Sequence, residues 1–197
     1  MGFVKRTGQF FFVWRDKLPV PLVLAMAGCA RPRLLNWLVG LPLILLGEAL
    51  RIWALMHIGP KTRTRSICAE RLITSGPYSH CRNPLYLANF TKILGFMVIS
   101  GKAVFAAVVA MFYLLEFSTM IPYEEGFLAE QFPDAHKCYR EVVPAFLPTL
   151  NANSRFDAAP NFTLPEALRS EKRTFASTSL ILLLVAVAAA FRKEKSA

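Results

Sequence analysis

The sequence has few acidic residues and lacks the cysteine spacing of a metal site. Its 197 residues include 13 Asp and Glu against 23 Lys and Arg, which gives a formal net charge of +10. The four cysteines form no Cys-x-x-Cys pair and have no histidine pair at ligand spacing, so we expect free thiols and no bound metal. The first residues lack an apolar core followed by a small-residue cleavage site, so we expect no removable signal peptide.

Hydrophobic residues, in contrast, make up 54% of the chain. This share is too high for a water-soluble domain of this length, so we expect a protein that lives in a bilayer. In a membrane protein, a basic excess indicates contact with anionic cytosolic leaflets and a biased topology. The basic residues are scattered between apolar runs and form no stripe with aromatic residues, so we expect no binding of nucleic acid.

The apolar runs predict an all-α, polytopic membrane protein of about five transmembrane helices, with residues 1–197 forming a single domain. Residues 1–17 mix aromatic and basic side chains and are expected to lie in the headgroup layer. The family core of spans occupies 18–148, a linker and surface helix 149–173, and the last span and tail 174–197. The five runs are 18–30, 34–58, 85–101, 103–121 and 175–191. The first is short for a span and could form a hairpin with the second.

The breaks between these runs predict the topology. Gly101-Lys102 suits a tight turn between antiparallel spans, and Pro122 is expected to end the span that starts at 103. The segment 123–140 is amphipathic and charged, so we expect a cytosolic helical segment. Most Lys and Arg residues fall in the amino terminus, the loop 59–82 and the segment 122–173, which places these parts on the cytosolic side.

Four charged residues fall inside the apolar runs. Glu48 and Arg51 are three residues apart and share a helix face, so they are either functional or an internal ion pair. Lys92 and Glu116 are expected to face the bundle interior, a cavity or an end, because a charge that faces lipid is costly.

A polar stretch from 73 to 86 leads directly into an apolar run and indicates a site at the membrane edge. Gly76-Pro77 is a turn signal, and Pro84 suits the first position of a helix that begins there. Arg82 and Asn83 would then lie at the helix start, where the backbone amides and the helix dipole favour an anionic group. The alternative is an interfacial loop in which Arg82 contacts lipid phosphate.

The order of motifs resembles that of the isoprenylcysteine carboxyl methyltransferases and the related phospholipid methyltransferases over residues 40–148. It reads G-P-Y-x-x-x-R-N-P-x-Y, a pair of spans, E-E-x-x-L, a tyrosine and V-P-x-x-x-P. Where the prenylcysteine enzymes usually have Arg-His-Pro, this chain has Asn83, which is similar to the phosphatidylethanolamine N-methyltransferases. Glu70 stands where a histidine is common. The substrate class therefore stays open.

The resemblance implies that S-adenosylmethionine binds between the loop, the carboxyl-side helix and the span ends, while a lipid acceptor enters from the bilayer. The cofactor carries a carboxylate, an ammonium and a sulfonium, for which a planar guanidinium, acids and aromatic faces are suitable partners. We expect Arg82 to take the carboxylate and Glu124 or Glu125 to face a positive group. The candidate catalytic residues are Arg82, Glu124 and Glu125, and the candidate cofactor contacts are Leu72, Ile73, Gly76, Tyr78, Arg82, Asn83, Tyr86, Glu125 and Tyr139.

The sequence thus predicts a multi-pass membrane methyltransferase that uses S-adenosylmethionine, with its site facing the cytosol. Its acceptor would be an isoprenylcysteine carboxylate or an aminophospholipid. Methyl transfer needs positioning and electrostatics but no covalent enzyme intermediate, so the lack of a Ser-His-Asp set is no objection. The alternatives are a membrane reductase of the sterol-reductase type that uses NADPH and a non-catalytic lipid-binding membrane protein.

Overall fold

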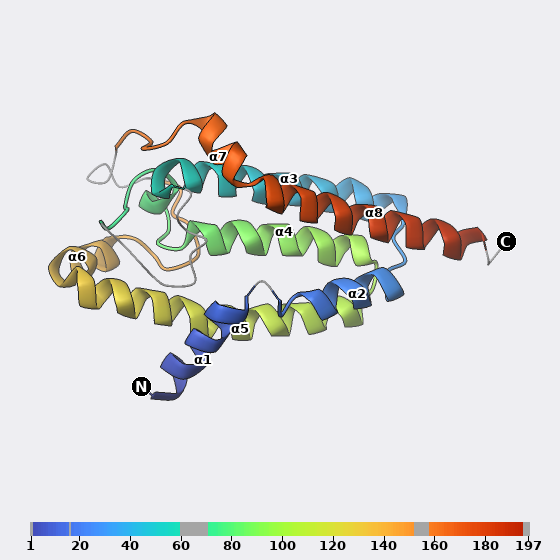
Figure 1. Cartoon of the computed structure of the whole chain (residues 1–197), viewed down its shortest axis with the longest axis horizontal. Helices are drawn as coiled ribbons and strands as arrows, with labels where there is room; N and C mark the ends of the chain where they lie inside the picture. Colours follow the sequence, from blue (N-terminus) through green and yellow to red (C-terminus); the bar gives the residue numbers. More distant parts are fainter. Residues whose placement is uncertain (1, 16, 60–70, 152–157, 195–197) are drawn as a thin grey trace.

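The computed structural model describes residues 2–15, 17–59, 71–151 and 158–194, and this part is helical with no strand. Figure 1 shows that α3, α4, α5 and α8 run along the long axis of the molecule, with α6 and α7 toward one end. The elements are α1 (Gly2–Trp14), α2 (Val20–Cys29), α3 (Leu34–Ile58), the 3-10 helix η2 (Gly76–Ser79), α4 (Pro84–Ser100), α5 (Ala103–Gln131), α6 (Pro133–Val142), α7 (Leu164–Ser170) and α8 (Lys172–Glu194).

Among the described residues, three helices are long and apolar enough to cross a membrane, namely α3, α5 and residues Lys172–Arg192 of α8. The shorter apolar helices α2 and α4 have 10 and 17 residues. At 1.5 Å per residue, α2 covers about 15 Å and cannot cross a hydrocarbon core of about 30 Å. The prediction of an all-helical membrane protein is confirmed, whereas the count of five spans is not.

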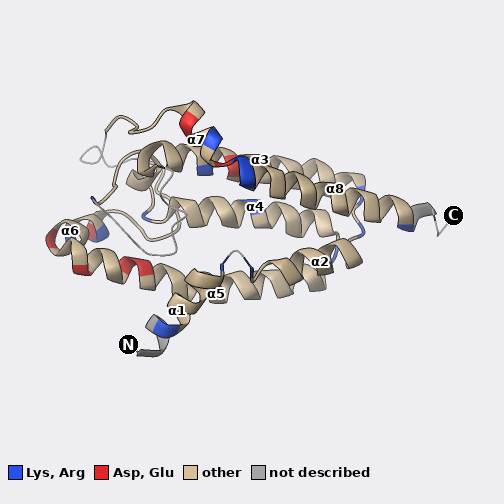
Figure 2. Cartoon of the chain, viewed as in Figure 1, with Lys and Arg blue, Asp and Glu red and all other residues tan. Residues whose placement is uncertain are grey.

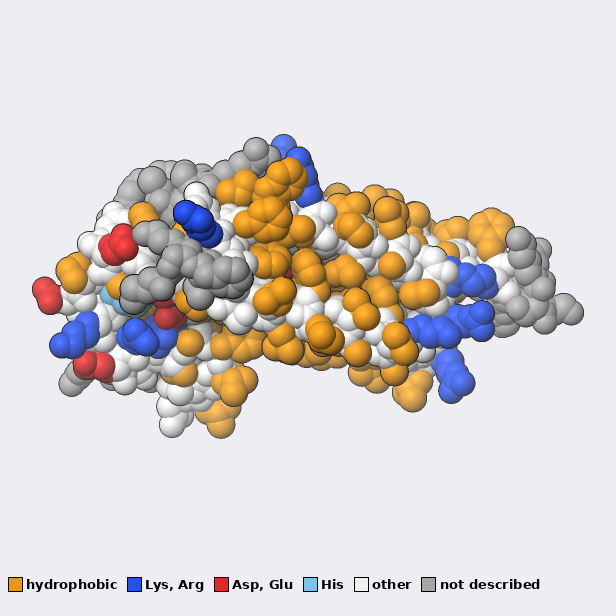
Figure 3. Space-filling model, turned by 90° about the horizontal axis from the view of Figure 1, so that it is seen from below, with side chains coloured by type: hydrophobic (Ala, Val, Ile, Leu, Met, Phe, Trp, Pro, Cys, Tyr) orange, Lys and Arg blue, Asp and Glu red, His pale blue; other side chains and the backbone are white. Residues whose placement is uncertain are grey.

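Packing between the helices buries only part of their apolar side chains. A buried cluster of Met26, Ala30, Ile44, Ile99 and Val185 joins α2, α3, α4 and α8. Many other large hydrophobic side chains of α3, α5 and α8 are exposed, and Figure 3 shows them as a broad apolar band between charged ends. An exposed band of this kind is what a lipid-facing surface requires.

Helix α4 starts and ends where the sequence has a proline and a glycine. Helix α4 begins at Pro84, as predicted, because a proline at the first position lacks only an amide that has no helical partner. The predicted turn after α4 is also present, and Gly101 ends the helix with φ 62° in the left-handed region. The backbone amide of Arg31 donates to Ser100 O at 2.9 Å, so this turn packs against the loop between α2 and α3.

The prediction that Pro122 ends a span is wrong, since α5 continues through it to Gln131. The cytosolic segment predicted at 123–140 is therefore the end of α5 followed by α6, with the break at Phe132-Pro133. Proline removes one helical hydrogen bond, but contacts beyond it hold the helix. The Tyr123 ring lies 6.0 Å from the ring of Phe12 in α1, and the Glu124 carboxylate accepts a hydrogen bond from Tyr86 in α4.

An internal ion pair between Glu48 and Arg51 is also excluded, because each pairs with a different helix. Oε1 of Glu48 accepts hydrogen bonds from Nζ of Lys92 at 3.2 Å and from Oγ1 of Thr178 at 2.8 Å. Arg51 donates to the two carboxylate oxygens of Glu171 at 2.8 and 3.3 Å. The charges of α3 therefore connect it to α4 and to the segment where α7 meets α8. Lys92 faces the bundle interior, as expected.

Candidate active site

The site is built on the turn that precedes α4. Gly76 has φ 61°, and a Cβ atom there would lie 2.2 Å from Nε2 of His57, so this position admits glycine alone. The His57 ring is fixed by a hydrogen bond of 2.9 Å between its Nδ1 and Oγ of Ser75. Ser79 closes the turn by donating to Gly76 O at 2.7 Å. The end of α3 thus sets the position of η2 and of the residues after it.

Arg82 and Glu125 form a two-pronged ion pair at the start of α4. Nε and Nη2 of Arg82 lie 2.9 and 3.1 Å from Oε1 and Oε2 of Glu125. The two side chains are 8% and 16% exposed, so water screens this pair only partly. Nη1 of Arg82 donates to the carbonyls of Arg140 and Val143. The guanidinium therefore joins α4, α5 and the chain after α6.

Asn83 reinforces the same junction. Its Nδ2 donates to Oε1 of Glu125 at 2.9 Å and to Ala145 O at 3.0 Å. The backbone amide of Arg82 donates to Pro144 O at 2.8 Å. The segment 143–145 thus supplies three carbonyl groups to the α4 start. Sequence reasoning did not assign these carbonyls, although the V-P-x-x-x-P motif marks the segment that provides them.

Three tyrosines surround this junction. The Tyr86 hydroxyl donates to Oε1 of Glu124 at 2.8 Å, and the Tyr139 hydroxyl donates to Tyr78 O at 2.6 Å. The Tyr78 hydroxyl is buried and has no hydrogen-bond partner among the described residues. Burial raises the pKa of both Tyr78 and Tyr139, so each keeps its proton at neutral pH. Tyr78 therefore offers a buried donor with no partner in the described part of the chain.

His136 of α6 is a further buried group near the ion pair. Burial lowers its pKa, and the Glu125 carboxylate opposes that shift in part. Its Nε2 atom is buried without a partner among the described residues. His136 is 4% exposed and neutral at pH 7. Its place in an amphipathic segment is the only sequence feature that could have indicated it.

The structure brings most of the predicted site residues to one end of the bundle, where Figure 2 shows the acidic residues of α5 and α6. Arg82 and Asn83 both donate hydrogen bonds to Glu125. Tyr86 donates a hydrogen bond to Glu124, the residue before Glu125. Leu72 and Ile73 are half-buried in the segment before η2 and take no part in these hydrogen bonds. Glu70 and the rest of 60–70 lie outside the described residues.

Cys81 gives a test of this packing, because it is 1% exposed and burial raises its pKa to about 11. Roughly one Cys81 thiol in 3,000 is then ionised at pH 7.5, and the thiolate is the reactive form. Cys138 on α6 is exposed. In variants that keep one cysteine each, we expect a maleimide to label Cys138 within minutes and Cys81 only after unfolding or as the pH approaches 11. Equal labelling of both folded variants at pH 7.5 would contradict this placement.

Comparison with known proteins gives this geometry a family context. The model of the "Isoprenylcysteine carboxyl methyltransferase (ICMT) family" matches residues 38–130, which include α4, both glutamates and Arg82. The cobalt-zinc-cadmium resistance protein CzcN of Cupriavidus metallidurans is 34% identical over 71% of this chain and 63% of its own length. The nickel-cobalt-cadmium resistance protein NccN of Alcaligenes xylosoxydans xylosoxydans is 30% identical over 71% and 64%. No solved structure matches the chain.

A protein-S-isoprenylcysteine O-methyltransferase of Schizosaccharomyces pombe is 29% identical over 53% of this chain and 46% of its own length. The chain thus spans less than two thirds of the length of these relatives. Fold and site define an all-helical integral membrane protein with a polar site at one end of its helices. The matched segment specifies this class further: residues 38–130 match the isoprenylcysteine carboxyl methyltransferase family.

Proposed function

We propose that this protein is a methyltransferase that uses S-adenosylmethionine and methylates a lipid or lipid-modified acceptor from the bilayer, with its site facing the cytosol. The acceptor is an isoprenylcysteine carboxylate or an aminophospholipid. The observation that carries the proposal is the convergence of Arg82, Asn83, Glu124 and Glu125 from α4 and α5 within the segment that matches the family.

The charges of this site suit the amino-acid end of the cofactor. That end is a zwitterion, with one carboxylate and one ammonium, and the Arg82–Glu125 pair presents the complementary charges. Because both prongs of the guanidinium are occupied, Arg82 can take a carboxylate only by exchanging Glu125 for it. Glu125 would then be free to face the ammonium. The cofactor's two charges thus replace an ion pair that already exists, and neither charge is left unpaired.

Two other groups have spare hydrogen-bonding capacity. Oε2 of Glu124 accepts no hydrogen bond from a described residue, while Tyr86 holds Oε1 of the same carboxylate. The buried Tyr78 hydroxyl likewise has no partner in the described part of the chain. A buried donor without a partner costs roughly 1–3 kcal/mol, which a ligand acceptor would recover. Both groups fit a polar ligand that carries positive charge and acceptor atoms, and backbone groups near Leu72, Ile73 and Gly76 would take its adenine.

When bound, S-adenosylmethionine supplies a sulfonium methyl group that an acceptor atom takes in an in-line displacement. Glu124 would face the positive charge, since Tyr86 fixes the direction of its carboxylate. Asn83 would still hold Glu125 in place after Arg82 has exchanged it for the cofactor carboxylate. A carboxylate acceptor releases no proton, whereas an amine acceptor must lose one, and Glu124 is the base within reach of the site. Tyr139 keeps the Tyr78 backbone in position through its hydroxyl.

The names of two relatives refer to resistance to metal ions. Within the described residues, no group of three or more His, Cys, Asp or Glu side chains could hold a metal ion. Two carboxylates held by Arg82, Asn83 and Tyr86 are arranged for a cationic organic ligand. We therefore propose methyl transfer, and not metal binding, as the activity of this site.

A binding measurement on the purified full chain in lipid nanodiscs tests the proposal. We expect saturable binding of radiolabelled S-adenosylmethionine in the micromolar range, displaced by S-adenosylhomocysteine but not by NADPH. With a lipid extract added, the labelled methyl group should appear in the lipid fraction. Tight NADPH binding without S-adenosylmethionine binding would favour the reductase alternative. Binding of neither would favour a non-catalytic lipid-binding protein.

A further inference from the structure

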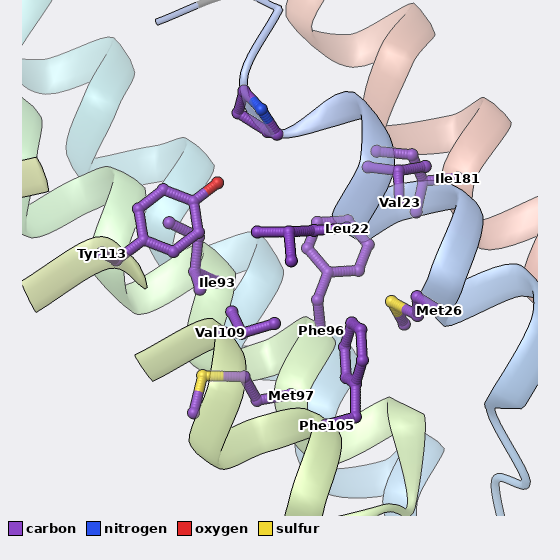
Figure 4. Close-up of a pocket in the computed structure, with 11 residues that line it drawn as sticks. Leu22, Val23, Met26, Ile93, Phe96, Met97, Phe105, Val109, Tyr113 and Ile181 are labelled. Carbon is purple, nitrogen blue, oxygen red and sulfur yellow. The ribbon is translucent and has the colours of Figure 1, made fainter. Parts of the chain in front are cut away.

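An apolar cavity of about 60 Å³ lies between α2, α4, α5 and α8, away from the Arg82–Glu125 site. Figure 4 shows Leu22, Phe96, Phe105 and Val109 around it, with Tyr113 at one edge. The Tyr113 hydroxyl is the polar group of this lining, so the cavity is unsuited to water and suited to hydrocarbon.

The position of the cavity along α5 places it in the half of the membrane opposite the site. From Glu124 to Tyr113 is 11 residues, or about 16 Å of helix, which equals about half of a 30 Å hydrocarbon core. The lining continues for a further 8 residues to Phe105, about 12 Å deeper. The residues that line the cavity therefore lie between the middle of the membrane and the far headgroup layer.

Among the described residues, three exposed cations lie at that far end. Lys102 precedes Phe105 by one turn of α5, and Arg31 and Arg33 follow the cavity-lining Met26 at the end of α2. The hydrogen bond between Arg31 N and Ser100 O brings the two turns that carry them together. Figure 3 shows basic side chains gathered at this end beside the apolar band.

No described carboxylate side chain balances these cations. Along the helices, Glu116 is 14 residues from Lys102 and Glu48 is 15 residues from Arg33, each about 20 Å away. Arg31, Arg33 and Lys102 form no ion pair with a described residue. A positive cluster without described acids, placed at headgroup depth, attracts anionic lipid.

We propose that the cavity and these three cations form one binding site for an anionic phospholipid of the leaflet opposite the Arg82–Glu125 site. Part of one acyl chain fills the cavity, and the phosphate lies among Arg31, Arg33 and Lys102. Charge complementarity selects this occupant over a zwitterionic lipid. The depth of the cavity selects it over the tail of a methyl acceptor, which would have to pass half of the membrane before reaching Tyr113. The site is independent of the proposed methyl transfer.

Native mass spectrometry of the purified full chain tests the site directly. The chain is incubated with phosphatidylglycerol or with phosphatidylcholine of identical acyl chains. We expect phosphatidylglycerol to be retained at least about tenfold more than phosphatidylcholine, because each basic residue near a membrane surface contributes roughly 1 kcal/mol toward anionic lipid. The triple variant R31Q/R33Q/K102Q should lose this preference. The matched control K137Q/R169Q/K172Q, which removes three exposed cations outside the cluster, should keep it.

The role of the cavity is tested with Val109→Phe, which narrows the space between the helices. Val23→Phe, on the opposite wall, is the second variant if the first fails to fold. Either variant should reduce phosphatidylglycerol retention several-fold with the cations intact. Glycerol phosphate and inorganic phosphate should not be retained, since neither has a chain for the cavity. Equal retention of the two lipids, equal loss in both triple variants, or retention of free phosphate would overturn the proposal.

Discussion

Replacing Arg82 with alanine should reduce methyl transfer by at least about 100-fold while the helical bundle stays folded. The guanidinium holds both oxygens of Glu125, the Arg140 carbonyl in α6 and the Val143 carbonyl directly after α6. Its loss leaves a mostly buried carboxylate with Asn83 as its remaining donor, and that carboxylate would turn toward water. Removing one preorganised charged partner from an active site commonly costs 10²–10³-fold in rate. The measurement is the initial rate of label transfer, with circular dichroism to show that the fold is kept.

Two further variants give this prediction its controls. Lys137→Ala removes an exposed cation of α6 that forms no hydrogen bond or ion pair with a described residue, and its rate should stay within about twofold of the unchanged chain. Arg82→Lys keeps the charge but loses the planar fork, so it should recover only part of the rate. A folded Arg82→Ala protein with the full rate would show that the ion pair has no part in the reaction.

The pairing of Arg82 with Glu125 also predicts that the two act as one unit. If the guanidinium serves by holding the carboxylate, Arg82→Ala and Glu125→Ala should each remove most of the activity. The double variant should then lose little more than either single variant. Independent roles for the two residues would instead multiply the two losses. The double-variant cycle thus separates positioning of Glu125 by Arg82 from direct binding by each residue.

Local sequence signals predicted the parts of the fold that local geometry decides. Pro84 marks the start of α4 and Gly101 its end, because each fixes a backbone conformation within one turn. Pro122 misled the same reasoning. A proline ends a helix only where a non-helical conformation of the chain is more stable. Contacts from Phe12 and Tyr86 stabilise the helical conformation beyond Pro122, so α5 is continuous. Those contacts come from helices distant in sequence and leave no local trace.

In the site too, contacts between residues distant in sequence could not be predicted from local signals. The grouping of Arg82 with Glu125 was predicted from the order of family motifs, since 43 residues separate them and no spacing rule connects them. Their direct pairing was not anticipated, because each had been assigned to a different end of the cofactor. The carbonyls at 143–145 were missed because backbone acceptors carry no residue-type signal. The partner of Arg51 is 120 residues away, beyond any helical periodicity.

The ion pair between Arg51 and Glu171 leads to the second large expected effect, on stability. The Glu171 side chain is 0% exposed and holds the guanidinium at Nε and Nη2, while Nη1 donates to Asn89 at 3.1 Å. Glu171→Ala leaves a largely buried cation without its counter-ion, which typically costs 3–5 kcal/mol. For a chain of 197 residues this corresponds to a fall of roughly 10 °C in the thermal midpoint, measured in nanodiscs.

Glu141→Ala is the matched control, because this exposed acid of α6 should shift the midpoint by less than about 2 °C. The informative variant is the double change R51L/E171L. Replacing both charges with apolar groups removes the desolvation cost together with the pair, so much of the lost stability should return. If Glu171→Ala and Glu141→Ala have the same thermal midpoint, the ion pair does not hold α7 and α8 to α3. If the double variant is less stable than Glu171→Ala, Arg51 stabilises the bundle in another way. Its hydrogen bond to Asn89 is the contact that would account for this.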